Sequence, residues 1–141
     1  MIRIAAALLE EIRHAVRHGY PEEVCGVLLG PVSARDRIVL RVVPVANARE
    51  EERARRYLIP AERLREIEST AQRDGLDIVG FYHSHPDHPA IPSGYDRDHA
   101  WPWYTYLIVS VSAGNGTVTR AWRLADDRSA LQEEEILEET S

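Results

Sequence analysis

Two histidines and an aspartate in the middle of the chain have the residue types and spacing of metal ligands. His83 and His85 flank Ser84 at the end of a strand-like run, and Asp96 follows a stretch with several prolines. Side chains alternate between the faces of a strand, so His83 and His85 point to one side and Ser84 points to the other. Two imidazoles and one carboxylate leave a fourth tetrahedral position for water, and imidazole favours zinc over calcium or magnesium. The pattern therefore predicts a catalytic zinc ion.

Peptide hydrolysis at such a zinc ion also needs a base. The metal lowers the pKa of its water to about 7, and a nearby carboxylate takes the proton and passes it to the leaving amine. Glu22 and Glu23 precede a predicted strand and are the best-placed acids. Their spacing alone does not choose between them, and an exposed acidic turn after Pro21 is the structural alternative.

Each of these residues also has a purely structural interpretation. A His-x-His at the end of a strand is often only a polar terminus. Ser93-x-x-Asp96 after Pro92 is a capping box, in which the serine caps a helix and the acid reaches back to its backbone. In that interpretation Asp96 cannot fully serve both the helix end and a metal ion. We interpret the nearby His88 and His99 as surface residues.

Composition places the chain among ordinary globular proteins. Its 141 residues suit one domain, with 44% hydrophobic and 28% charged residues. The net charge of −6 argues weakly against nucleic acid as a partner, and no apolar stretch is long enough to cross a membrane. No signal peptide is recognisable, so we expect a cytoplasmic protein.

Cys25 is the only cysteine of the chain. A single cysteine excludes an internal disulfide and a thiolate-rich zinc cluster. It also excludes a deaminase, whose zinc signature needs a Cys-x-x-Cys pair. We expect Cys25 to be a small residue of the core.

Helical and strand-like patterns interleave along the chain without a strict β-α-β order. The predicted helices cover residues 4–18, 60–75 and 93–100, and the predicted strands cover 24–29, 37–45, 77–83, 104–111 and 117–124. Residues 48–56 are interpreted as a solvated loop. We therefore predict a single α/β domain over residues 1–125, with a mixed β-sheet flanked by helices. Residues 126–141 form an acidic tail, for which we expect an edge strand followed by disorder.

The central residues resemble the JAMM (MPN+) zinc metalloproteases, in particular their small prokaryotic branch. The family pattern is a remote glutamate, then His-x-His, seven residues, Ser, two residues and Asp. Every spacing matches between His83 and Asp96. The flanking stretches 20–26, 75–80 and 106–110 also look like this branch.

The resemblance assigns roles residue by residue. It makes His83, His85 and Asp96 the zinc ligands, Glu23 the general base and Ser93 the serine whose hydroxyl helps to hold the oxyanion. It also implies a sheet with flanking helices that is similar to the fold of cytidine deaminases.

Members of the family cut peptide or isopeptide bonds that follow the flexible tail of ubiquitin or a ubiquitin-like protein. For the short prokaryotic members the resemblance implies a sulfur-carrier protein that ends in Gly-Gly. Only residues 97–103 separate Asp96 from the next predicted strand, and nothing there resembles the insertions that grip ubiquitin in eukaryotic deubiquitinases. We therefore expect a ubiquitin-like sulfur carrier as substrate, and a homodimer is compatible with the sequence.

Other functions stay open beside this one. A non-catalytic scaffold of the same fold would bind partners without hydrolysing them, although such relatives typically lack the ligands and the glutamate. A RadC-like protein would carry His-Asn-His-Pro-Ser-Gly, whereas residues 83–88 read His-Ser-His-Pro-Asp-His. Trp101 and Trp103 could line a substrate groove, but core or rim packing is the favoured interpretation.

Overall fold

The computed structural model describes residues 1–31, 37–47, 59–114 and 116–140, so the loop predicted at 48–56 lies outside the described residues. Among these residues the helices are α1 (Ala6–Gly19), α2 (Ala61–Arg73) and α3 (Gly94–His99). The strands are β1 (Ile2–Ala5), β2 (Cys25–Gly30), β3 (Arg37–Val39), β4 (Arg41–Val45), β5 (Asp77–Pro86), β6 (Thr105–Val111), β7 (Thr117–Leu124), β8 (Leu131–Glu134) and β9 (Ile136–Glu139).

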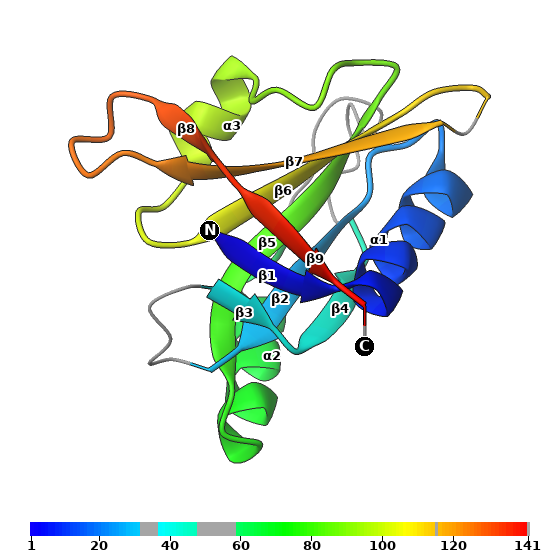
Figure 1. Cartoon of the computed structure of the whole chain (residues 1–141). Helices are drawn as coiled ribbons and strands as arrows, with labels where there is room; N and C mark the ends of the chain where they lie inside the picture. The colour runs from blue at the N-terminus through cyan, green and yellow to red at the C-terminus, as the bar shows by residue number, and fades with distance from the viewer. Residues whose placement is uncertain (32–36, 48–58, 115, 141) are drawn as a thin grey trace.

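Six of the strands form the main sheet, in the order β4-β2-β5-β6-β7-β8. Within it β5 and β6 run parallel, and the other neighbours are antiparallel. The three short strands form a second sheet in the order β3-β1-β9, in which both pairs are parallel. Figure 1 shows this small sheet in front of the main one. The predicted mixed α/β architecture is confirmed.

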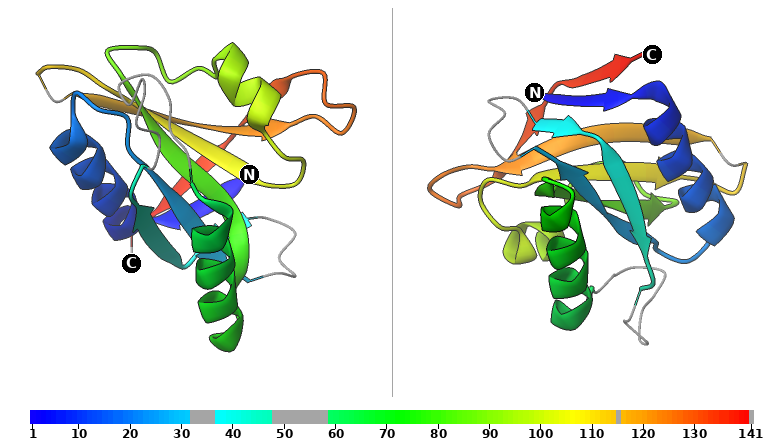
Figure 2. Two further views of the ribbon diagram at one scale, coloured as in Figure 1. Left: turned by 180° about the vertical axis from the view of Figure 1, so that it is seen from behind. Right: turned by 90° about the horizontal axis from the view of Figure 1, so that it is seen from below.

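The main sheet is covered on both faces. Helix α1 and the small sheet lie on one side of it, and α2 and α3 lie on the other (Figure 2). On the first side the buried Ile12 and Val16 of α1 pack in a cluster with residues of both sheets. On the second side Ile67 and Ala71 of α2 pack on β2 and β5. The middle strands are therefore buried on both faces.

Strand β5 alternates between these two layers, which decides where its histidines point. Tyr82 belongs to the cluster under α1, whereas Phe81 packs against the cluster under α2. Continued from Phe81, this alternation directs His83 and His85 toward the layer of α2 and α3, and Ser84 toward the layer of α1.

The start of the chain and the third predicted segment differ from the sequence-based prediction. Ile2 and Ile4 alternate into the core as β1, and α1 begins only at Ala6. The predicted strand 37–45 divides at the exposed Leu40 into β3 and β4, which belong to different sheets. Two alternating residues are too few to indicate a strand, and only tertiary pairing separates β3 from β4.

The acidic tail is more ordered than the sequence predicts. Strand β8 is the expected edge strand of the main sheet, but the disorder expected after it is replaced by β9, which pairs with β1. Ile136 packs against the core cluster under α1. Arg123 Nη2 lies 3.1 Å from Glu134 Oε2. The tail is ordered because its apolar and acidic side chains find partners on other strands.

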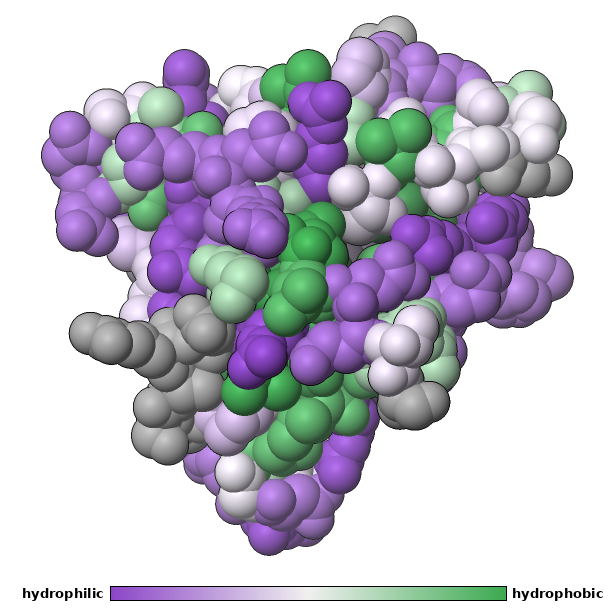
Figure 3. Space-filling model, viewed as in Figure 1, coloured by the Kyte–Doolittle hydropathy of each residue, from purple (hydrophilic) through white to green (hydrophobic). Residues whose placement is uncertain are grey.

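The surface that carries the small sheet is not uniformly polar. Figure 3 shows hydrophobic residues in a band down the middle of this face, with hydrophilic residues on both sides. Among the described residues, no helix combines the length and the apolar character needed to span a membrane.

Candidate metal centre

Both histidines stand near the end of β5, where the strand is hydrogen-bonded to β2 on one edge and to β6 on the other. His83 is 1% exposed and His85 is 8% exposed. Ser84 points to the opposite side, where its Oγ accepts a hydrogen bond from the Val24 N–H at 2.9 Å. The doubly bonded strand thus presents both imidazoles to one side of the sheet.

Asp96 reaches the same point from α3. Its Oδ1 lies 3.2 Å from His83 Nε2, and its Oδ2 lies 3.0 Å from His85 Nε2. The two Nε2 atoms are 3.2 Å apart, and one ligand atom from each residue lies within 4.8 Å of the others. Tetrahedral zinc ligands at about 2.0–2.1 Å from the metal are about 3.3 Å from one another. The three side chains therefore fit a small tetrahedral ion.

A backbone carbonyl sets the orientation of His85. Its Nδ1 lies 2.8 Å from the Pro89 carbonyl oxygen and can donate an N–H to it. This hydrogen bond leaves Nε2 as the nitrogen that faces Asp96 and His83, where its lone pair would bind a metal ion. Pro89 belongs to the loop between β5 and α3, so the loop that separates the ligands in sequence also orients one of them.

Asp96 takes part both in the capping box of α3 and in the cluster of possible metal ligands, which the sequence presented as alternatives. The Ser93 N–H donates to Asp96 Oδ2 at 2.9 Å, and the Asp96 N–H donates to Ser93 Oγ at 3.1 Å, which forms the capping box. The same carboxylate faces both histidines. The expected conflict does not arise, because an ionised carboxylate has about four acceptor sites and the cap uses one of them.

Burial and charge act in opposite directions on this cluster. Burial alone would raise the pKa of Asp96, but His83 and the hydrogen bonds from both histidines hold that pKa well below its usual value. Burial lowers the pKa of His83. Burial also acts to lower the pKa of His85, but the hydrogen bonds to Asp96 and the Pro89 carbonyl outweigh it and raise that pKa. A metal ion binds only the neutral form of each imidazole, so metal binding weakens as the pH falls.

The register between β2 and β5 separates the two candidate bases. Cys25 is paired with His83, so the antiparallel register continued by two residues brings Glu23 opposite His85. Glu23 is 3% exposed, whereas Glu22 is exposed. Of the two acids, only Glu23 is buried beside the ligand strand.

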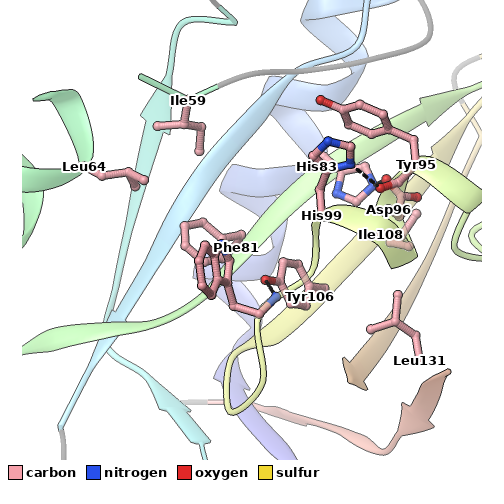
Figure 4. Close-up of a pocket in the computed structure, with 11 residues that line it drawn as sticks. Ile59, Leu64, Phe81, His83, Tyr95, Asp96, His99, Tyr106, Ile108 and Leu131 are labelled. Carbon is pink, nitrogen blue, oxygen red and sulfur yellow. Dashed lines mark hydrogen bonds and ion pairs between the residues drawn. The ribbon is translucent and has the colours of Figure 1, made fainter. Parts of the chain in front are cut away.

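Cavities open on two sides of the ligand cluster. His83 and Asp96 lie at one end of a mostly apolar cavity (Figure 4). Its other lining residues are Ile59, Leu64, Phe81, Tyr95, His99, Trp101, Tyr106, Ile108 and Leu131. The second cavity is bordered by Glu23, His85 and Ser93, together with residues of the loop that follows β5. The five predicted site residues therefore all border one of these two spaces.

The walls of the apolar cavity include residues that sequence reasoning did not assign to the site. Trp101 is 64% exposed and lines the cavity, so the groove interpretation applies to it. Trp103 does not line this cavity and packs against Arg37, whose Cζ lies 3.9 Å from its ring centroid. His99 is exposed, as expected, but it stacks on Tyr95 and lines the same cavity. Their spacing gave no signal, because segments far apart in the sequence form this cavity.

Two further residues behave as their sequence context suggests. His88 is exposed, although it also borders the second cavity. Cys25 is buried, and burial together with the charge of Glu23 raises its pKa to about 12. A thiol that holds its proton so firmly is a poor nucleophile, which suits a residue of the core.

Residues 5–125 match a family model described as prokaryotic homologs of the JAB domain. The protein belongs to this family. This JAB-domain chain is 42% identical to the desampylase of Haloferax volcanii, over 74% of this chain and 73% of the relative. It is 31% identical to the probable TtuB-protein conjugate cleaving protease of Thermus thermophilus, over 77% of this chain and 69% of the relative. It is 32% identical to the CysO-cysteine peptidase of Mycobacterium tuberculosis, over 94% of this chain and 88% of the relative.

Solved structures share the fold of this JAB-domain chain. The solution structure of a protein from Desulfitobacterium hafniense has a TM-score of 0.84 and 31% identity, and covers 100% of this chain and 94% of its own. A JAB1/MPN domain protein from Archaeoglobus fulgidus has a TM-score of 0.58 and 17% identity, over 96% and 99% of the two chains, which shows the fold alone. Members of the family depend on a metal ion, and His83, His85 and Asp96 form a cluster of metal-ligand side chains.

We expect His85→Ala to weaken zinc binding at least about 100-fold, because it removes one of three ligand side chains from the JAB-domain cluster. His88→Ala is the matched control, since His88 is exposed in the following loop and lies outside the cluster. Elemental analysis of protein incubated with zinc and then desalted measures the effect. An unchanged zinc content in His85→Ala would contradict the ligand assignment.

Proposed function

We propose that this JAB-domain protein is a zinc-dependent peptidase or isopeptidase that hydrolyses the bond after the C-terminal Gly-Gly of a ubiquitin-like or sulfur-carrier protein. The proposal is carried by one observation: two imidazoles and one carboxylate lie together, with a buried glutamate just before the neighbouring strand β2. A structural zinc site has four protein ligands, whereas a catalytic site keeps one position open. The relatives named for conjugate cleavage and for a CysO-cysteine peptidase support the substrate class.

The proposed zinc ligands are His83, His85 and Asp96. A zinc ion bound by them would supply a Lewis acid for the scissile carbonyl and a water whose pKa is lowered to about 7. Two nitrogen donors and one oxygen donor support zinc over calcium or magnesium, which prefer oxygen ligands.

Glu23 is the proposed general base. It borders the same cavity as His85 and Ser93. Its carboxylate takes a proton from the attacking water and gives it to the nitrogen of the leaving amine as the C–N bond breaks. The side chain thereby returns to its starting state in each turnover.

Ser93 is the proposed donor to the oxyanion. Its Oγ accepts the Asp96 N–H, which leaves the hydroxyl proton available for another acceptor. Ser93 is exposed and borders the cavity of Glu23. Its hydroxyl donates to the carbonyl oxygen as that oxygen becomes negative in the transition state.

The two cavities would bind the two parts of the substrate that the scissile bond joins. The leaving amine receives its proton from Glu23, so it lies in the cavity of Glu23 and His85. The chain before the bond then lies in the apolar cavity beside Asp96. Because glycine has no side chain, an extended Gly-Gly end suits the space beside walls such as Phe81 and Trp101.

Cleavage of candidate substrates tests the proposed function. Zinc-loaded protein should shorten ubiquitin-like or sulfur-carrier proteins of the same genome that carry a few residues after Gly-Gly, and mass spectrometry should find products that end at the second glycine. A chelator should stop the reaction, and added zinc should restore it. Intact substrates with zinc-loaded protein would contradict the proposal, and binding without cleavage would favour the non-catalytic scaffold.

Glu23→Gln should keep zinc and lower kcat by about 10²–10⁴, because the ligands are untouched while the base is lost. Glu22→Gln is the matched control, since Glu22 is exposed and does not border either cavity. The same cleavage assay and zinc analysis measure both variants. Full activity in Glu23→Gln would remove Glu23 from the mechanism, and a selective loss in Glu22→Gln would assign the base to Glu22.

A further inference from the structure

The turn that carries Glu23 is tightly packed against β2. It connects α1 to β2, and the Glu22 N–H donates to the Gly19 carbonyl at 2.9 Å. A Cβ at Gly19 would lie 2.1 Å from Val24 Cγ1, so the two ends of the turn are in direct contact. A movement of this turn would therefore move Glu23 with it.

Three hydrogen bonds hold the chain at Glu23 and Val24. Asn47 Nδ2 donates to the Glu23 carbonyl oxygen at 3.1 Å. The next residue, Val24, donates its N–H to Ser84 Oγ at 2.9 Å, and its carbonyl accepts the Ser84 N–H at 3.0 Å. The backbone after Glu23 is thus tied to the ligand strand.

A further contact ties the turn to the loop that follows His85. The Tyr20 hydroxyl lies 2.7 Å and 3.0 Å from the two carboxylate oxygens of Asp87, to which it donates its proton. Tyr20 stands three residues before Glu23, and Asp87 stands two residues after His85. The bond therefore joins the segment of the proposed base directly to the segment of the proposed ligands.

Both ends of this contact are anchored. The Tyr20 ring packs against the core cluster under α1, which fixes the direction of its hydroxyl. The Asp87 N–H donates to the Val111 carbonyl at 2.7 Å, and the φ of Asp87 is 58°, in the left-handed region that asparagine and aspartate tolerate best among residues other than glycine. The hydrogen bond therefore spans two fixed points.

We infer that Tyr20 and Asp87 are positioning residues for the general base, whose hydrogen bond holds the turn before Glu23 against the loop that follows His85. The inference rests on the proposed function, because it assigns Glu23 to proton transfer. Tyr20 and Asp87 do not touch the reacting atoms in this assignment. They act through the distance between the Glu23 carboxylate and the metal ligands, and small errors in such a distance slow proton transfer strongly.

The test compares Tyr20→Phe with the matched Tyr104→Phe, in which the hydroxyl removed lies outside both cavities that border the ligands. In the zinc-loaded full chain, Tyr20→Phe should lower kcat about five- to fiftyfold with KM and zinc content unchanged, and Tyr104→Phe should match the wild type. Asp87→Asn keeps an acceptor and tolerates the left-handed backbone, so it should retain at least about half of kcat. The Tyr20→Phe, Asp87→Asn double variant should be no slower than Tyr20→Phe, because both changes act on one contact.

A second readout separates this inference from the proposed function. Amide hydrogen exchange of the backbone at residues 22–24 should become faster in Tyr20→Phe and stay unchanged in Tyr104→Phe, whether or not a substrate has been found. An unchanged kcat together with unchanged exchange would overturn the inference. So would a fall in zinc content or thermal stability that accounts for the lost activity. Wild-type protein that cleaves nothing would count against the proposed function alone.

Discussion

Hydrogen bonds between β2 and β5 hold the two parts of the proposed catalytic centre together. Glu23 stands just before β2, and His83 and His85 stand near the end of β5, so antiparallel pairing brings them to one place. A slip of one residue would turn Glu23 to the other face of the sheet, because strand side chains alternate. Gly26 supports the observed register: it pairs with Tyr82, and a Cβ there would lie 2.0 Å from the Tyr82 ring.

Next to this strand pair, a helix cap and a loop carbonyl also orient the side chains of the ligand cluster. The capping box starts α3 and at the same time turns the Asp96 carboxylate toward the histidines. The Pro89 carbonyl is part of a loop and also orients the ring of His85. Because these groups have two roles each, a short loop and the six-residue helix α3 can support buried ionisable groups. The charge of the Asp96 carboxylate is matched by the Ser93 N–H and by the two histidine rings of β5, which is the condition for burying a carboxylate.

Those features of the fold and the site that depend on neighbouring residues could be predicted from the sequence. Those that depend on the pairing of distant strands could not. Strand alternation correctly indicated that His83 and His85 share a side, and the Ser93-x-x-Asp96 pattern indicated the cap. The choice of Glu23 over Glu22 came from family resemblance alone. The register between β2 and β5, which separates the two acids, cannot be predicted from a short stretch of sequence. The strand β9 was missed, and the position of Trp101 in a cavity wall was only the less favoured interpretation, because their partners lie far away in the sequence. The homodimer stays a prediction.

The central claim is that His83, His85 and Asp96 hold one metal ion with an open coordination position beside Glu23. Diffraction data collected at the zinc absorption edge from crystals of the zinc-loaded protein test it most directly. The account predicts a strong anomalous peak about 2.0–2.2 Å from both Nε2 atoms and from an Asp96 oxygen, with the Glu23 carboxylate near the ion but not bound to it. A peak at other residues would contradict the account, and so would Glu23 as a fourth ligand that closes the coordination shell.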